Sequence, residues 1–539
     1  MSNPKKIFVI MLMVTIAAFV LRIGGLDRRP MHGDEAVHAV KFGKLLEEGV
    51  YRYDPFEYHG PTLNYLTLLP AWLSGAERLT QINEFTLRIV PVFFGTVLVL
   101  LLLFVIDGMG RAAVVCSAVA TAVSPAFVFF SRYYIQEMLL VCFSFGVIVC
   151  GYRYLRGKNI YWALLAGVCF GLCHATKETF VLVFASMLFA IILTVMLQRP
   201  QDFSISRFTK IIKLPHVIAA VFTACITSAL FYSSFFTNLP GVPASVRAYG
   251  SYLFRAGGSG VHDHQWYYYF KTLIHCEYMF LSISSEIVIV VLAVVGFVMA
   301  MRSRNLSKLN VGFVRFIAFY TVILAVLYSA IPYKTPWCLL GFLHGMILLA
   351  GFAAVELIRS ARTFMVRCLV VLVLAAAVVW LSWQSCLGIY KYDTDPRNPY
   401  VYAHPSVDVF EMTQRIRQIA AVHPEGNDMY IQVICPGADY WPLPWYLRDF
   451  SRVGWWSHVD ETSPSAPLII ASADVKSELL NKLYELPPPG ERNLYVPLFE
   501  QRMYLRPRIE LLGFVTKDLW DNFRDSQAKL NPSGTVAEE

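Results

Sequence analysis

Charged residues are scarce in this sequence. They make up 16% of the 539 residues, against roughly a quarter in an average soluble domain, while hydrophobic residues make up 56%. This composition excludes an ordinary soluble protein and is typical of an integral membrane protein. Nucleic-acid-binding motifs and basic patches interleaved with exposed aromatic residues are also missing. The net charge of +8 therefore indicates basic loops held against membrane lipids, and no nucleic-acid partner.

Cysteine pairs with redox or zinc-binding spacing are absent as well. The chain has eleven cysteines, but they form no CxxC pair and no zinc-finger pattern. Most of them lie inside apolar runs, where a free cysteine behaves as a small hydrophobic residue. We therefore predict that the cysteines serve packing.

Long apolar runs, in contrast, are abundant. A helix needs about 20 apolar residues to cross a bilayer. We predict eleven spans, near residues 7–26, 87–106, 112–130, 134–154, 161–176, 178–197, 215–236, 278–301, 312–331, 336–357 and 366–387. Lys and Arg recur in every second connecting segment, beginning with Lys5 and Lys6. The positive-inside rule then places the N-terminus in the cytoplasm and the segment after the last span outside.

The C-terminal part of the chain is more polar and changes its pattern. Two stretches have helical periodicity and two read as buried strands, at residues 407–422 and 474–486 and at residues 429–435 and 466–472. Helices that alternate with strands indicate a small α/β fold. We predict a membrane domain at residues 1–387 and an extracytoplasmic α/β domain at residues 388–539.

Two adjacent carboxylates, Asp34 and Glu35, follow the first span on the predicted outer side. Capping the helix that starts there requires one acid, not two. A carboxylate at the water–lipid boundary can accept a proton from an attacking hydroxyl or amine. Two carboxylates can instead hold a divalent cation. The residues themselves leave these alternatives, and helix capping, open.

Further charged residues lie on the same side of the membrane. Arg132 and Glu137 are the first and last residues of "RYYIQE", Lys177 lies in "ATKET", and Lys334 lies in "PYKTPW". Basic residues and tyrosines also occur simply because they favour the interface. Separate cations on several outer loops, however, suit a phosphate headgroup. We predict Glu137 as a further catalytic acid and the three basic residues as donor-phosphate ligands.

Three histidines complete the outer set. His59 lies in "EYHGP", and His262 and His264 lie two residues apart in "VHDHQ". Histidine and carboxylate side chains are common ligands of zinc and manganese. A divalent metal cation is the one cofactor that the sequence suggests, with these histidines as its candidate ligands.

The order and sidedness of these motifs resemble the superfamily of polyprenyl-phosphate-sugar glycosyltransferases. That superfamily includes protein O-mannosyltransferases and the lipid A aminoarabinose transferase. The outer "DE" pair, "SRYYIQEMLLV" and "ATKET" carry the resemblance, while "PYKTPWCLL" and "YWPLPWYLRD" look closest to a prokaryotic branch described as flippase activity-associated protein.

The resemblance implies the membrane glycosyltransferase architecture called GT-C. It makes Asp34 the catalytic base or metal-binding acid and Glu35 its regular neighbour. Lys177 then matches a position near the donor phosphate, and Glu137 stands where many members have aspartate. His59 stands where some relatives have glutamate, which weakens the transfer of a metal site.

The expected function is inverting transfer of a sugar from a polyprenyl-phosphate donor to a glycan, lipid or protein acceptor. The reaction is expected at the outer face of the cytoplasmic (inner) membrane. The alternative is a flippase or transporter component for lipid-linked sugars, which predicts polar residues near the membrane midplane. A non-catalytic sensor that binds glycans through its C-terminal part is a third class. Reactive residues gathered on the outer loops favour the enzyme.

Overall fold

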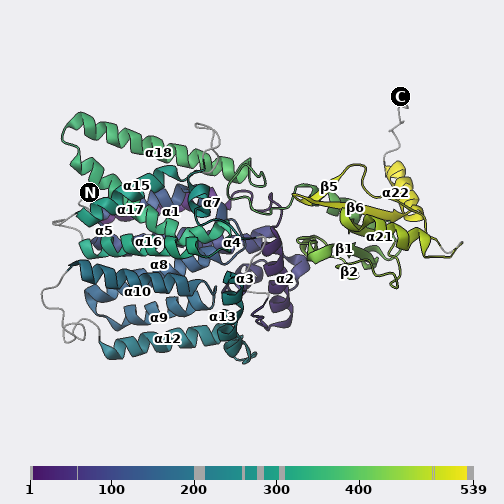
Figure 1. Cartoon of the computed structure of the whole chain (residues 1–539), viewed down its shortest axis with the longest axis horizontal. Helices are drawn as coiled ribbons and strands as arrows, with labels where there is room; N and C mark the ends of the chain where they lie inside the picture. Colours follow the sequence, from purple (N-terminus) through teal and green to yellow (C-terminus); the bar gives the residue numbers. More distant parts are fainter. Residues whose placement is uncertain are drawn as a thin grey trace. The chain divides into compact units, whose positions relative to one another are not determined.

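The computed structural model describes residues 4–56, 59–198, 213–257, 262–275, 285–302, 310–488, 490 and 492–530 (Figure 1). The chain forms two compact units. The first comprises Met1–Leu26, Lys44–Glu77 and Asn83–Tyr402, and the second comprises Asp27–Gly43, Arg78–Ile82 and Ala403–Glu539. The segment with the two adjacent carboxylates therefore belongs to the second unit, together with the C-terminal part of the chain.

Among the described residues, eight helical segments are long and apolar enough to cross a membrane. They are α1 (Pro4–Ile23), α4 (Glu84–Leu101) with η2 (Leu102–Val105) and α5 (Ile106–Met109), α8 (Glu137–Gly157), α10 (Phe180–Gln198), α12 (Leu214–Tyr232), α16 (Val311–Ala330), η3 (Pro336–Leu339) with α17 (Leu340–Ser360), and α18 (Phe364–Tyr390). The shorter apolar helices are α6 (Arg111–Val123), α9 (Ile160–His174) and α15 (Ile287–Arg302). All of these helices overlap predicted spans, which confirms a multi-pass helical membrane protein, whereas the exact number of spans stays a prediction.

The predicted span at residues 112–130 is in fact two helices, α6 and α7 (Pro125–Phe130). Ser124 between them has an extended backbone, and its side chain accepts the N–H of Phe127. Pro125 has no N–H with which to continue α6, but it suits the first position of a new helix. After α7, the chain passes through the "SRYYIQ" segment before α8 begins at Glu137.

Arg22 joins α1 to the end of α6 inside the first unit. Its guanidinium is fully buried and donates to the carbonyl oxygens of Ala122 and Thr121 at 2.9 and 2.8 Å. The last carbonyls of a helix have no partner within that helix. Arg22 supplies this partner, and a buried charge is stabilised by several hydrogen bonds.

Short helices of the first unit connect the apolar ones. They are α3 (Thr62–Leu73), α13 (Gly241–Gly257) and α14 (Tyr268–Leu273). Helix α3 has the semi-apolar sequence TLNYLTLLPAWL, which we predict to lie at the membrane interface. Leu63 and Ala71 of this helix are buried, while Trp72 and Leu73 are exposed. Such a two-faced helix suits an interfacial position, which stays a prediction.

The second unit contains one mixed sheet with the order β2–β1–β3–β6–β4, and β5 also pairs with β6. Its strands are β1 (Ile431–Ile434), β2 (Val453–Trp456), β3 (Leu468–Ser472), β4 (Tyr495–Pro497), β5 (Met503–Arg506) and β6 (Ile509–Thr516). Strand β1 pairs in parallel with β2 and β3, and β6 is antiparallel to its three partners. The predicted small α/β domain is confirmed.

The second unit also contains helices. They are α2 (Gly33–Glu48), which begins in this unit, η1 (Leu79–Gln81), α19 (Asp408–Ala420), η4 (Gly426–Asp428), η5 (Pro436–Ala438), α20 (Leu443–Tyr446), η6 (Ala473–Val475), α21 (Lys476–Leu480) with the π-turn η7 (Asn481–Glu485), and α22 (Lys517–Leu530). Both predicted strands and both predicted helices of this region are present. Strands β1 and β3 are fully buried, which explains their mostly apolar sequences, interrupted in β1 by the buried Gln432.

Candidate active site

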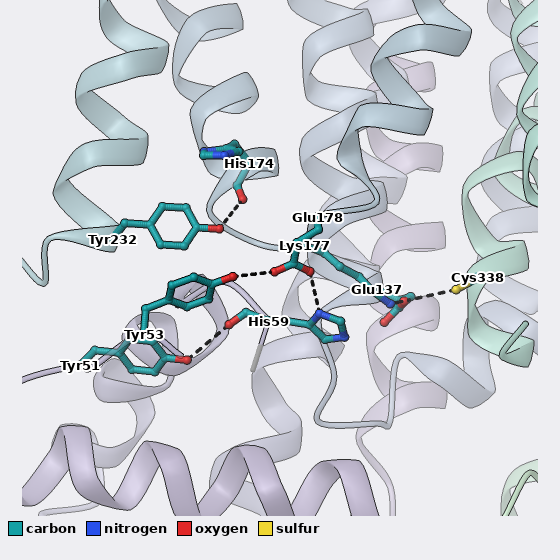
Figure 2. Close-up of polar contacts among 9 residues, drawn as sticks. All are labelled: Tyr51, Tyr53, His59, Glu137, His174, Lys177, Glu178, Tyr232 and Cys338. Carbon is teal, nitrogen blue, oxygen red and sulfur yellow. Dashed lines mark hydrogen bonds and ion pairs between the residues drawn. The ribbon is translucent and has the colours of Figure 1, made fainter. Parts of the chain in front are cut away.

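A buried ion pair lies where three apolar segments end in the first unit. Glu137 is the first residue of α8, and Lys177 lies in the turn between α9 and α10. The Lys177 ammonium donates to Glu137 Oε1, and each side chain is only 6% exposed. The thiol of Cys338, in η3, donates to the same oxygen at 3.8 Å (Figure 2). Burial alone would lower the pKa of Lys177, but the Glu137 carboxylate raises it well above its usual value. Lys177 is therefore charged at neutral pH.

The adjacent residue, Glu178, has different partners. Its carboxylate lies 2.8 Å from His59 Nδ1 and accepts the hydroxyl of Tyr53 at 3.0 Å (Figure 2). Burial raises the pKa of Glu178, but the charge of His59 and the hydrogen bonds outweigh burial and lower it overall. One tight turn thus directs a buried cation and a buried anion to separate partners.

The segment that carries Tyr53 and His59 is held close to this turn. The Thr62 N–H donates to the carbonyl oxygen of Ala175 at 3.2 Å. A Cβ added at Gly60 would lie 2.2 Å from that oxygen, so only glycine permits this approach. The ring of Tyr232 contacts that of Tyr53, and the Tyr232 hydroxyl donates to the His174 carbonyl at 2.9 Å (Figure 2). The sequence "HGP" therefore positions the histidine through the glycine that follows it.

Acid is expected to destabilise the first unit through Glu178. Its lowered pKa stabilises the fold at pH values above the pKa of an unfolded glutamate, about 4.3, and this stabilisation disappears as the pH falls through the lower folded pKa. The unfolding temperature of the detergent-purified chain should therefore fall more steeply below about pH 4 for the wild type than for Glu178→Gln. Glu48→Gln, at an acid whose side chain is 52% exposed, serves as the control. Identical acid profiles for wild type and Glu178→Gln would contradict the expectation.

Two of the predicted phosphate ligands bind backbone carbonyls in this structure. Arg132 donates to the carbonyls of Arg22, Gly24 and Gly25 at 2.8, 2.6 and 3.0 Å, which closes the C-terminal end of α1. The Lys334 ammonium donates to the carbonyls of His264, at 3.0 Å, and Ile331. Both cations thus hold loops together, and their predicted role toward phosphate stays a prediction.

The two adjacent carboxylates of the second unit have different surroundings. Glu35 is fully buried, pairs with Arg29 at 3.0 Å and accepts the N–H of His32 at 2.9 Å. This reach back to the residue before the helix resembles one half of a capping box. Asp34 is exposed in the first turn of α2. Helix capping therefore occupies Glu35 and leaves the Asp34 carboxylate facing solvent.

The predicted histidine ligands are not gathered into a metal site. His59 contacts Glu178, His262 Nδ1 lies 2.5 Å from the Tyr402 hydroxyl, and His264 stacks on Tyr268 with ring centres 4.2 Å apart. Among the described residues, no group of three or more His, Cys, Asp or Glu side chains is arranged to hold a metal ion. The positions of these residues therefore do not fit the suggested cation.

Sequence reasoning gave no role to Glu178, Tyr53 or Cys338. An available signal for Glu178 was its position beside Lys177 in a short turn between two spans, because buried charges near membranes need partners. Tyr53 and Cys338 lie far from this turn in the sequence, and nothing local to them predicts the contact.

A narrow cavity begins beside the ion pair. It is lined by Glu137, Cys338 and His344 among mostly apolar residues, and its volume of about 20 Å³ is room for about one water molecule. Nε2 of His344 is buried and has no hydrogen-bond partner in the described part of the chain. In this conformation the cavity is too small for a sugar headgroup.

Comparisons with known proteins agree with this architecture. No curated protein sequence gives a significant match to the chain. Residues 66–218, which include Glu137, Lys177 and Glu178, match the family described as dolichyl-phosphate-mannose-protein mannosyltransferase. The fold is similar to ArnT from Cupriavidus metallidurans bound to undecaprenyl phosphate, with a TM-score of 0.63 and 12% identity over 93% of this chain and 97% of that one.

A second solved structure with this fold is the oligosaccharyltransferase AglB from Archaeoglobus fulgidus, in complex with an inhibitory peptide and a dolichol-phosphate. Its TM-score is 0.54, with 10% identity over 98% of this chain and 78% of that one. The predicted GT-C-type fold is therefore confirmed, and the match of residues 66–218 agrees with the predicted resemblance to protein mannosyltransferases.

Proposed function

We propose that this chain is a membrane glycosyltransferase that uses a polyprenyl-phosphate-linked sugar as its donor. The observation that carries the proposal is the match of residues 66–218 to a mannosyltransferase family, because this region contains Glu137, Lys177 and Glu178. The bound undecaprenyl phosphate of ArnT and dolichol-phosphate of AglB support a lipid-phosphate donor.

Asp34 is the proposed base. A hydroxyl or amine of the acceptor attacks the anomeric carbon, the bond from that carbon to the phosphate oxygen breaks, and Asp34 accepts the proton of the attacking group. One displacement inverts the anomeric centre. The exposure of Asp34, beside a neighbour that is buried against Arg29, supports this division of roles.

Lys177 is the proposed partner of the departing phosphate. An ammonium group has three N–H groups, and in the described part of the chain one of them donates a hydrogen bond to Glu137. Lysine acts on phosphate as a compact point charge, and its raised pKa keeps that charge at neutral pH. Glu137 then positions the ammonium and balances its charge when no donor is bound.

The proposed location is the cytoplasmic (inner) membrane, with the N-terminus inside and the second unit outside. This orientation places basic helix ends in the cytoplasm, as the positive-inside rule favours. Among them are Arg153 and Arg156 at the end of α8 and Arg302 at the end of α15. The acceptor is then a glycan, lipid or protein on the outer side.

The test is to reconstitute the chain in liposomes with radiolabelled polyprenyl-phosphate sugars and to add membrane lipid, glycan and protein fractions as acceptors. Transfer of label to one of these fractions is the expected result. The same liposomes report movement of the donor between leaflets. Movement of the donor without transfer would replace the proposed transferase by a flippase. Absence of both transfer and movement with every donor would also overturn the proposal.

A further inference from the structure

The second unit contains a polar cavity that the proposed chemistry does not use. Its volume is about 370 Å³, within the range of about 300–1,000 Å³ typical of small-molecule sites. Glu411 and Arg415 of α19 form one wall, and Phe499, Glu500 and Gln501, between β4 and β5, form the other. Leu498 and Met503 are buried and also line the cavity.

Hydrogen bonds hold these walls in place. The N–H of Tyr504, in β5, donates to Asp408 Oδ2 at the start of α19, at 2.9 Å. The Ser406 N–H donates to the carbonyl of Leu505, also at 2.9 Å. The helix and the strand that border the cavity are thus joined directly, so the cavity is preformed rather than assembled by a ligand.

The ring of Phe499 lies close to the backbone of a glycine in β6, Gly513. The Leu498 N–H donates to the carbonyl of Gly513, in β6, at 2.9 Å. A Cβ added at Gly513 would lie 2.7 Å from a ring carbon of Phe499. Because no such atom is present, the ring lies directly against the sheet and offers a rigid apolar surface at the cavity.

The charges of the cavity do not neutralise one another. Glu411 and Arg415 are four residues apart on α19, a spacing that often forms an ion pair. Among the described residues neither forms one, and the Arg415 guanidinium lies over the rings of Trp520 and Phe523, 5.9 and 5.6 Å from their centres. A strong acceptor and a strong donor therefore border the same space without using each other.

This pattern selects among ligand classes. Two carboxylates against one guanidinium disfavour a phosphate, and the guanidinium disfavours a simple cation. A hydroxyl both donates and accepts, so neighbouring hydroxyls satisfy Glu411 and Arg415 together. The flat ring of Phe499 suits the apolar face of a sugar ring. We propose that this cavity binds a neutral oligosaccharide. The proposal requires no transferase activity and stands apart from the proposed function.

The test is direct binding to the full chain, solubilised in a detergent without a sugar headgroup, because maltosides and glucosides would occupy the cavity. Trisaccharides of mannose, glucose and N-acetylglucosamine are the probes, with inorganic phosphate and spermidine as anion and cation probes. Isothermal titration should give a Kd of about 1 mM or below for at least one trisaccharide. Phe499→Ala and Glu411→Gln should each weaken that binding at least tenfold.

Two further variants sharpen the result. Gly513→Ala replaces no lining residue, but its Cβ would lie 2.7 Å from both Leu498 Cβ and the Phe499 ring and would displace them, so it should weaken binding as well. Glu478→Gln, at an exposed acid of α21, should leave binding unchanged. Unfolding temperatures establish that each variant folds. Absence of binding by all three sugars, binding insensitive to Phe499→Ala and Glu411→Gln, or competition by phosphate or spermidine would overturn the proposal.

Discussion

Sugar transfer by Asp34→Asn is expected to be about 100 to 10,000 times slower than by the wild type, the range that a general base contributes. Asparagine keeps the shape of the side chain but cannot accept the proton of the attacking acceptor. The donor does not bind through this proton, so the KM for the donor should change little while kcat falls. Initial rates with a radiolabelled polyprenyl-phosphate sugar provide the measurement.

The matched control for this substitution is Asp518→Asn. Asp518 is likewise an exposed acid in the first turn of a helix, α22, in the same unit. Loss of one such carboxylate costs a helix no more than about 1 kcal/mol, so both variants should fold. Equal turnover by the wild type and Asp34→Asn would refute the proposed base. Equal losses of turnover in Asp34→Asn and Asp518→Asn would show that the effect comes from helix stability and not from catalysis.

Lys177→Met is expected to destabilise the protein by about 3–5 kcal/mol, because it leaves the buried Glu137 carboxylate without its partner. The double variant Lys177→Met with Glu137→Gln removes both charges and should recover most of that stability. Its transfer activity should nevertheless stay low, since the departing phosphate has lost its cation. Thermal unfolding in detergent and transfer rates separate the two effects.

An exposed pair provides the control for this comparison. Lys517 and Asp521 are 2.7 Å apart, and both side chains are 48% exposed. Surface pairs contribute about 0–1 kcal/mol, so Lys517→Met should change stability little. A Lys177→Met variant as stable as the wild type would contradict the buried pair. Recovery of activity in the double variant would contradict the phosphate role of Lys177. It would not contradict the contribution of the ion pair to stability.

Much of the fold was predictable because bilayer crossing imposes a length and a composition on each helix. The two buried strands of the second unit were equally visible as short, mostly apolar runs. Strand β6 was not predicted, since its burial alternates and Gly513 interrupts its pattern of large side chains. The break at Ser124 was missed because an apolar sequence continues on both sides of it.

The candidate site was predictable as a set of residue types in the segments between the spans, but not as a set of partners. Arg132 and Lys334 have the same sequence signature as a phosphate ligand, a lone cation at the end of a span. Only the folded chain shows that the carbonyls at the end of α1 and before η3 bind them. Local sequence does not encode which distant backbone groups lack a hydrogen-bond partner.

The sequence by itself determined the membrane class and the approximate positions of the helices, because hydropathy acts locally along the chain. The sidedness of the charged loops is its prediction, drawn from the loop charges. The tertiary structure alone decided that Asp34 is exposed while Glu35 is buried, and that Lys177 and Glu178 point to different partners. Those outcomes depend on Arg29, Glu137 and His59, whose contacts arise when the elements pack. A buried charge is stable only beside its partner, and packing decides which partner it has.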